Sequence, residues 1–160
     1  MGEQNIATIT KEQNPRRITQ PFVIVGCLVE KDGRFLLIHQ NGKWNHPCGW
    51  LEMEENLVDG AKREAEEEIG LEVEIKGLIG VYTLIKHKGE KILHAVKFIF
   101  KAQLTGKEAK HQDNLRYGWF TVTQMKTMDF WDPDVPMIAE QAMRNRIYSL
   151  QVISNTTAAK

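Results

Sequence analysis

The feature that most constrains this chain is an acidic run that also has the pattern of an amphipathic helix. Residues 52–68 read EMEENLVDGAKREAEEE, with only two basic residues to offset the negative charge. Asn56 is a natural N-cap and Gly70 a natural residue to end a helix, so the sequence predicts a helix over 57–69. Its apolar positions form one stripe that must pack against a core: Leu57, Val58, Ala61, Ala65 and Ile69.

Three carboxylates lie along the edge of that stripe. Glu64, Glu67 and Glu68 are spaced i, i+3 and i+4, which brings them together on one side of a helix. Like charges so arranged repel, and burial beside a core further disfavours the ionised form. A divalent cation would resolve the conflict, and an all-oxygen ligand set suits Mg²⁺ or Mn²⁺ better than Zn²⁺. A solvated acidic helix face is the competing interpretation.

Size and composition indicate one ordinary globular domain. The 160 residues are 42% apolar and 26% charged, and Lys plus Arg equals Asp plus Glu at 21 each. Because no net charge attracts a polyanion, we expect no nucleic acid partner. The longest apolar stretch, near 22–29, is too short to span a membrane, and the polar first residues lack the centre of a secretory signal. Cys27 and Cys48 are too few for a disulfide framework, which favours the cytoplasm.

The order of elements predicts an α/β fold. We expect residues 1–20 to form a flexible arm, 21–150 a single domain and 151–160 a frayed tail. A second helix is expected from Val135 to about Leu150, and 41–55 reads as a long loop. The expected strands are a hairpin over 21–30 and 35–40, then 71–78, 81–87, 94–104 and 115–122, with a polar turn at 88–91. Helices on opposite sides of non-alternating strands favour an α/β/α sandwich around a mixed β-sheet.

The residues around the acidic helix resemble the signature of the Nudix hydrolases. Gly49 is followed after five residues by Glu55, and after seven more by the run REAEEEIGL of 63–71. The segment WNHP at 44–47 and the late strand ending in Trp119-Phe120 are also similar to that family, so the likeness spans about residues 21–125. Three positions depart from the usual pattern without touching a carboxylate: Cys48, Gly60 and Ala65.

The resemblance implies a set of roles. Glu64, Glu67 and Glu68 are implied as ligands of Mg²⁺, with Mn²⁺ as an alternative, and the backbone carbonyl of Cys48 or Gly49 as a further ligand. Arg63 is implied to pair with Glu55 and hold the loop against the helix, as an outer support of the ligands. In this family a metal-bound water attacks one phosphorus of a diphosphate and the other phosphate leaves.

The general base is left open. Glu64 and Glu67 are candidates on the helix, and Asp113 is a candidate in the later loop, where relatives often carry an acid. Glu108 and His111 are neighbouring alternatives to Asp113. A carboxylate within hydrogen-bond reach of the attacking water would serve in either place.

Substrate identity is the weakest expectation, because one Nudix scaffold hosts many substrates. The expected substrate is a small nucleotide or pyrophosphate compound. The run from Trp44 to Glu52 and the arrangement Asp113-x-x-Arg116-x-x-Trp119 look like the branch that hydrolyses nucleoside diphosphates and thiamine pyrophosphate. Trp44 is a candidate stacking surface for the substrate, although a tryptophan in such a sandwich is more often part of the core.

Two other functions stay open. An isoprenoid-diphosphate isomerase shares this scaffold and uses a catalytic cysteine, which Cys48 could supply. A non-catalytic nucleotide-sensing domain would bind diphosphates without turnover. The oligomeric state is also open, with a homodimer as one option.

Overall fold

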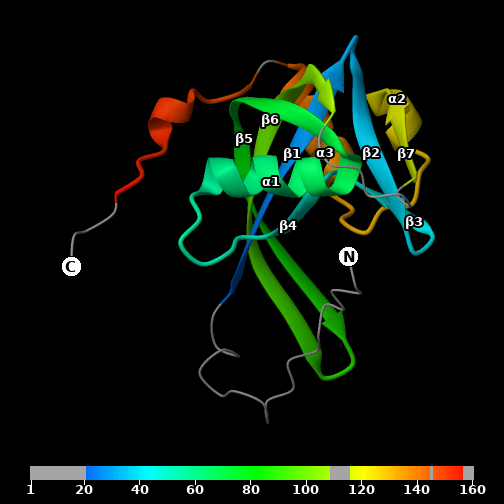
Figure 1. Ribbon diagram of the computed structural model, residues 1–160. Coiled ribbons are helices and arrows are strands. Elements are labelled where there is room, and N and C mark those ends of the chain that lie inside the picture. Colours follow the sequence, from blue (N-terminus) through cyan, green and yellow to red (C-terminus); the bar gives the residue numbers. More distant parts are fainter. Residues whose placement is uncertain (1–20, 109–115, 145, 157–160) are drawn as a thin grey trace.

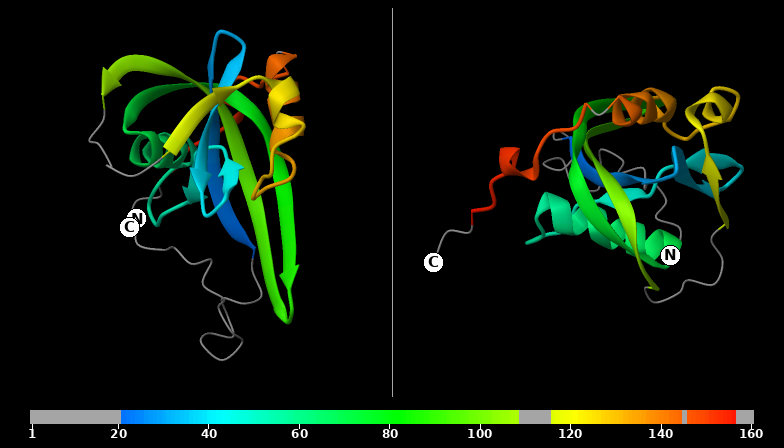
Figure 2. Two further views of the ribbon diagram at one scale, coloured as in Figure 1. Left: turned by 90° about the vertical axis from the view of Figure 1, so that its right-hand side faces the viewer. Right: turned by 90° about the horizontal axis from the view of Figure 1, so that it is seen from above.

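A twisted sheet lies between two layers of helix (Figures 1 and 2). The structure, a computed structural model, describes residues 21–108, 116–144 and 146–156. Its elements are β1 (Phe22–Lys31), β2 (Arg34–Gln40), β3 (Lys43–Asn45), β4 (Cys48–Trp50), α1 (Leu57–Ile69), β5 (Leu71–Lys88), β6 (Lys91–Glu108), β7 (Arg116–Phe120), α2 (Val122–Met125), α3 (Val135–Met143) and the 3-10 helix η1 (Leu150–Val152).

The sheet is mixed, as the sequence predicts. Its order is β3-β2-β1-β6-β5, with β4 paired to β1 and β7 paired to β2. β1 and β6 run parallel, from the pair Phe22 and Ala95 to the pair Val29 and Ala102, and the other strand pairs are antiparallel. The central position of β1 explains why every residue from Ile24 to Val29 is buried.

Side chains of β1 alternate between two cores, one on each face of the sheet. Val25, Cys27 and Val29 pack with the apolar stripe of α1 in one core. Leu28 packs with α3 in the other. Viewed from above, α1 lies on one side of the sheet while α2 and α3 lie on the other (Figure 2), so the α/β/α sandwich is confirmed.

Helix α1 has the predicted bounds and caps. The side chain of Asn56 accepts a hydrogen bond from the backbone N–H of Asp59 at 2.9 Å. Gly70 ends the helix with a φ of 67°, a conformation that favours glycine. Inside the helix, a Cβ at Gly60 would lie 2.7 Å from the Glu55 carboxylate, so the missing side chain lets the loop pack closely.

Both predicted hairpin turns are confirmed, but two predicted strands are one. Asp32 and Gly33 adopt positive φ between β1 and β2, and Gly89 does so between β5 and β6. Residues 71–88 form the single strand β5, whose pairing with β6 shifts register at three places, the last of them between Leu78 and Gly80. The predicted break between 78 and 81 therefore appears as a bulge within one strand and not as a loop. The strand stays continuous because β6 offers a partner along its whole length.

The region 41–55 is not only loop, since it contains the short strands β3 and β4. The predicted second helix is also wrong at its end: α3 stops at Met143 rather than near Leu150. Tyr148 instead exchanges backbone hydrogen bonds with Leu78, at 2.7 and 2.9 Å, beside the irregular stretch of β5. The short helix α2 was not predicted, although Thr121 and Gln124 form its capping box.

The remaining expectations concern the terminal segments, the later loop, membrane spans and the cysteines. Residues 1–20 and 157–160 lie outside the described residues, and so do Asp113 and His111. Over the parts of the chain that the structure describes, no helix is long and apolar enough to cross a membrane. Cys27 is a buried free thiol.

Candidate metal centre

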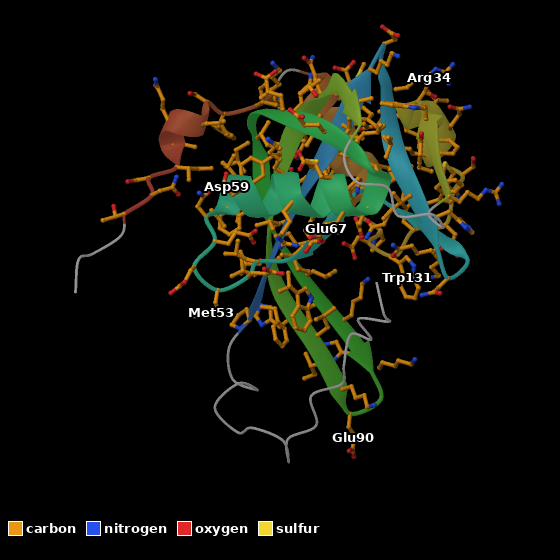
Figure 3. The ribbon with its side chains drawn as sticks, viewed as in Figure 1. Arg34, Met53, Asp59, Glu67, Glu90 and Trp131 are labelled. Carbon is orange, nitrogen blue, oxygen red and sulfur yellow. The ribbon has the colours of Figure 1, made fainter. Side chains whose placement is uncertain are left out.

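The three glutamates of the predicted cluster differ in their exposure. Glu64 and Glu68 are only 5% and 3% exposed, because they lie at the edge of the apolar stripe that packs on the sheet. The side chain of Glu67 is 44% exposed and points from α1 toward the side on which β4 lies (Figure 3). Two carboxylates of the cluster are therefore removed from water while the third stays accessible.

The backbone of β4 closes the cluster from the other side. The N–H of Cys48 donates to Oε2 of Glu68 at 2.9 Å. A Cβ at Gly49 would lie 2.2 Å from the carboxyl carbon of Glu64, which is closer than real atoms approach. Gly49 does not have a positive φ, so glycine is needed here for space rather than for its backbone freedom. The strand thus brings bare backbone against two carboxylates.

Arg63 connects the cluster to the loop before the helix. Its Nε and one terminal nitrogen donate to the two oxygens of Glu55 at 2.7 and 3.0 Å, a bidentate pair. The same terminal nitrogen donates to the backbone carbonyl of Trp50 at 3.0 Å. The other reaches Glu64 at 2.8 Å and Glu67 at 3.2 Å. One guanidinium therefore connects the end of β4, the loop and the acidic face of α1.

Burial sets the acid–base properties of these groups. Burial, reinforced by the neighbouring Glu64 carboxylate, raises the pKa of Glu68 to about 8 even though the N–H of Cys48 opposes the shift. Burial also raises the pKa of Glu64, against the effect of Arg63. The hydrogen bonds from Arg63 lower the pKa of Glu55. Glu64 and Glu68 thus resist ionisation, while Glu55 is held ionised.

A divalent cation that prefers oxygen ligands fits this arrangement. Glu68 makes no ion pair with any residue that the structure describes, and Arg63 offsets only part of the charge on Glu64 and Glu67. Carboxylate and carbonyl oxygens are the ligands that Mg²⁺ takes, usually together with water and substrate phosphates. The residues that could hold such an ion are Glu64, Glu67 and Glu68, with the carbonyl of Cys48 or Gly49.

Two other predicted site residues, Trp44 and Asp113, lie outside this cluster or outside the described residues. Trp44 lies in β3, where its ring packs edge-on against Phe120 at 4.7 Å and His39 at 4.8 Å between ring centroids. The ring contributes to the core beneath α3, which agrees with the competing interpretation of this tryptophan. Asp113 lies outside the described residues, so Glu64 and Glu67 are the candidate catalytic carboxylates that the structure places.

Sequence reasoning missed a second polar cluster inside the protein. Lys97 of β6 is fully buried, and its Nζ lies 2.8 Å from both oxygens of Asp134 and 3.4 Å from Asp132. His46 and Cys48 lie beside Asp132. The available signal was a lysine in the otherwise apolar run of β6, which cannot be buried without acidic partners.

Known proteins resemble this chain in sequence and in fold. Residues 20–141 match the NUDIX domain family. Phosphatase NudJ of Escherichia coli (strain K12) is 36% identical over 89 residues, which cover 53% of this chain and 56% of that protein. The chain thus matches little more than half the length of this relative.

Solved structures extend the likeness to the whole fold. A NUDIX hydrolase from Nitrosomonas europaea superposes with a TM-score of 0.76 at 23% identity, covering 86% of this chain and 98% of that one. Another from the same organism has a TM-score of 0.61 at 30% identity, with 79% and 72% covered. Because the family match takes in most of the chain and includes α1 and β4, the chain belongs to the Nudix domain family.

Proposed function

We propose that the protein hydrolyses a phosphoanhydride bond in a small nucleotide or related pyrophosphate compound, with Mg²⁺ or Mn²⁺ as cofactor. The observation that carries the proposal is the pair of buried carboxylates, Glu64 and Glu68, facing the bare backbone of Gly49 with the accessible Glu67 beside them. Such a cluster is costly in a folded protein unless a cation offsets it.

Each residue of the cluster has a proposed task. Glu64, Glu67 and Glu68 hold the cation together with the carbonyl of Cys48 or Gly49. The bound ion would neutralise charge on the diphosphate oxygens and lower the pKa of a coordinated water. Glu67, being half exposed, can accept the proton of the attacking water, and Glu64 is the other candidate on the helix. Asp113 remains a proposed alternative base from the later loop.

Arg63 and Glu55 are proposed as positioning residues. Their bidentate pair and the bond from Arg63 to the carbonyl of Trp50 hold β4 against α1. The distance between the Gly49 backbone and the carboxylates is set by these contacts. Ligands arranged before the ion arrives lose less conformational entropy when it binds.

Nucleoside diphosphates and thiamine pyrophosphate are the proposed substrates within this class. The sequence likeness at 44–52 and 113–119 supports them, and the relative named Phosphatase NudJ is compatible with release of phosphate. A screen of ADP, GDP, thiamine pyrophosphate, ADP-ribose and dinucleoside polyphosphates with Mg²⁺ and Mn²⁺, with products identified by chromatography, tests this choice. Preference for ADP-ribose or dinucleoside polyphosphates would contradict it.

The hydrolase assignment is tested by removing single charges from α1. Glu67→Gln and Glu68→Gln should each abolish turnover of the best substrate, while both variants keep the far-ultraviolet circular dichroism of the wild type. Glu66→Gln is a matched control, since Glu66 lies on the same helix and pairs instead with Lys62 at 3.7 Å. Full activity in both Glu67→Gln and Glu68→Gln would overturn the assignment.

The structure does not favour the two other functions. An isomerase would need a reactive thiol at Cys48, but burial and the nearby Glu68 raise the pKa of this thiol well above its ordinary value. A sensing domain that has lost its ligands would not keep three clustered carboxylates. Release of phosphate from a nucleotide decides against both. Two free cysteines, Cys27 and Cys48, support the cytoplasm as the proposed compartment.

A further inference from the structure

A second group of metal-binding side chains meets where the segment leading into β4 packs against the segment leading into α3. The ligand atoms of His46, Cys48 and Asp132, one nitrogen, one sulfur and one carboxylate oxygen, all lie within 4.8 Å of one another. His46 is fully buried and Asp132 is 5% exposed. None of the three side chains belongs to the carboxylate cluster on α1.

The imidazole of His46 is arranged as a metal ligand would be. Its Nδ1 lies 3.1 Å from the carbonyl oxygen of Pro47. A carbonyl can only accept a hydrogen bond, so Nδ1 carries the proton and Nε2 presents a bare lone pair. This buried Nε2 has no hydrogen-bond partner among the described residues. Metal-bound histidines characteristically donate their other ring N–H to such a carbonyl, whereas an unpaired buried acceptor destabilises the folded protein.

The other two side chains keep free electron pairs for a cation. The amide Nδ2 of Asn45 lies 3.6 Å from Sγ of Cys48 and its N–H donates to the sulfur. Asp132 accepts from Lys86 at 2.9 Å and from Lys97 at 3.4 Å, one bond to each oxygen. Each carboxylate oxygen has two lone pairs, so one bond to each leaves room for a further contact.

The surrounding charges do not exclude a cation. Lys97 is held by both oxygens of Asp134 at 2.8 Å, so its charge is largely offset there rather than directed at the three ligands. Lys86 and Lys97 together face Asp132 and Asp134, which makes the surrounding group neutral. Binding of the ion would displace the thiol proton of Cys48 to solvent, so that the sulfur brings one negative charge to the ion.

We propose that His46, Cys48 and Asp132 form a binding site for a borderline-soft divalent cation such as Zn²⁺, separate from the oxygen-ligand site on α1. Zn²⁺ binds nitrogen, sulfur and oxygen at about 2.0–2.3 Å in tetrahedral geometry, which places ligand atoms about 3.3–3.8 Å apart. The side chains therefore need to close by only about 1 Å, and water can take the fourth position.

Such an ion would connect the sheet to the helix layer that contains α3. Cys48 belongs to β4, and Asp132 belongs to the segment that leads into α3. The backbone N–H of Cys48 also donates to Glu68, so fixing the Cys48 side chain fixes the strand that lies against the carboxylates of α1. The proposed ion thus has a structural role beside the hydrolytic site.

Cobalt spectroscopy tests the site without using turnover. Full-length protein is treated with a chelator, supplied with excess Mg²⁺ to fill the oxygen-ligand site, and titrated with Co²⁺. The wild type should show a near-ultraviolet thiolate-to-cobalt charge-transfer band that saturates at one equivalent, and Zn²⁺ should displace the cobalt. Cys48→Ser should lose the band, while the matched control Cys27→Ala should keep it, because Cys27 lies in the core under α1.

Two further variants guard against misfolding of Cys48→Ser. His46→Gln and Asp132→Asn retain the thiol, so each should keep a charge-transfer band but weaken Zn²⁺ affinity by about tenfold or more. The proposal is overturned if the wild type shows no band, if the band survives in Cys48→Ser, or if both ligand variants bind Zn²⁺ like the wild type. The cobalt band does not depend on turnover. The hydrolase proposal is tested separately, by the activity of the Glu67→Gln and Glu68→Gln variants, so failure of one proposal can be told from failure of the other.

Discussion

At the scale of single residues, the candidate site depends on one missing side chain and one guanidinium. Gly49 leaves the space that the carboxylate of Glu64 occupies, and Arg63 holds the surrounding segments in register. Cys48, where the family often has glycine, shows no positive φ, so the neighbouring position tolerates a side chain. The two adjacent positions therefore differ in what they require of the chain.

Gly49→Ala should lower kcat by about 100-fold, the order expected when a catalytic ligand is displaced. The added methyl group would overlap the carboxyl carbon of Glu64, forcing that side chain or β4 to move. Steady-state kinetics over a range of Mg²⁺ concentrations would measure the change. Wild-type kcat at every Mg²⁺ concentration would show that Glu64 is not placed by this contact.

Arg63→Lys should reduce kcat by about 10- to 100-fold, as for other groups that orient metal ligands. Lysine keeps the charge but cannot make the bidentate pair with Glu55 together with the bond to the Trp50 carbonyl. Lys62→Gln is the matched control on the same helix, since the ion pair of Lys62 is with Glu66, one turn further along α1, rather than with the carboxylate cluster. Equal kcat values in the two variants would remove Arg63 from the positioning role.

The sequence predicted the residues of α1 better than those of the second cluster, for a physical reason. Helical spacing alone brings Glu64 and Glu68 to the edge of the apolar stripe, where the structure places them. The meeting of His46 with Asp132 depends instead on how β4 and the segment before α3 pack across the sheet. Nothing in local spacing encodes that contact.

At the scale of elements, the burial of Glu68 on α1 makes the free energy of unfolding of the metal-free protein depend on pH. Glu68 has a pKa of about 8 in the folded state against an ordinary value of 4.5. Between these values the folded state binds more protons than the unfolded state, so the free energy of unfolding falls as pH rises. The loss of stability begins as the pH rises above 4.5 and is complete once the pH exceeds about 8.

We therefore expect the metal-free protein to be less stable at pH 8 than at about pH 6. Urea unfolding after chelator treatment measures the difference. Glu68→Gln, which cannot ionise, should flatten the pH dependence and be more stable than the wild type at the higher pH. An increase in wild-type stability across this range would contradict the burial of an ionisable Glu68.

The sequence predicted the ends of an element correctly where local caps determine them. It did not do so where contacts with distant parts of the chain determine them. Asn56 and Gly70 fix both ends of α1 through local hydrogen bonds. The early end of α3 depends on Tyr148 pairing with Leu78 of a distant strand, which no local signal announces. The same holds for the continuity of β5, which its long partner β6 imposes.

At the scale of the whole molecule, the cation should act as part of the fold. An ion that binds only the folded state raises its stability by mass action. Mg²⁺ should raise the melting temperature more at pH 8 than at about pH 6, because protons compete for Glu68 at the lower pH. Thermal unfolding with increasing Mg²⁺ at the two pH values measures this, and Glu68→Gln should show a smaller rise. An equal rise in that variant would exclude Glu68 as a ligand.

The parallel pairing of β1 with β6 has a consequence for the order in which the chain folds. The strands β5 and β6 are neighbours in sequence and can form their hairpin early, whereas pairing of β1 with β6 must close a loop that contains β2, β3, β4, α1 and β5. The apolar stripe of α1 packs in one core with residues of β1, β5 and β6, so it is fully covered only after that step. A nascent chain released before β6 is complete would therefore contain both β1 and α1 but lack the strand that places β1 in the middle of the sheet, and refolding should be limited by how quickly β1 and β6 pair.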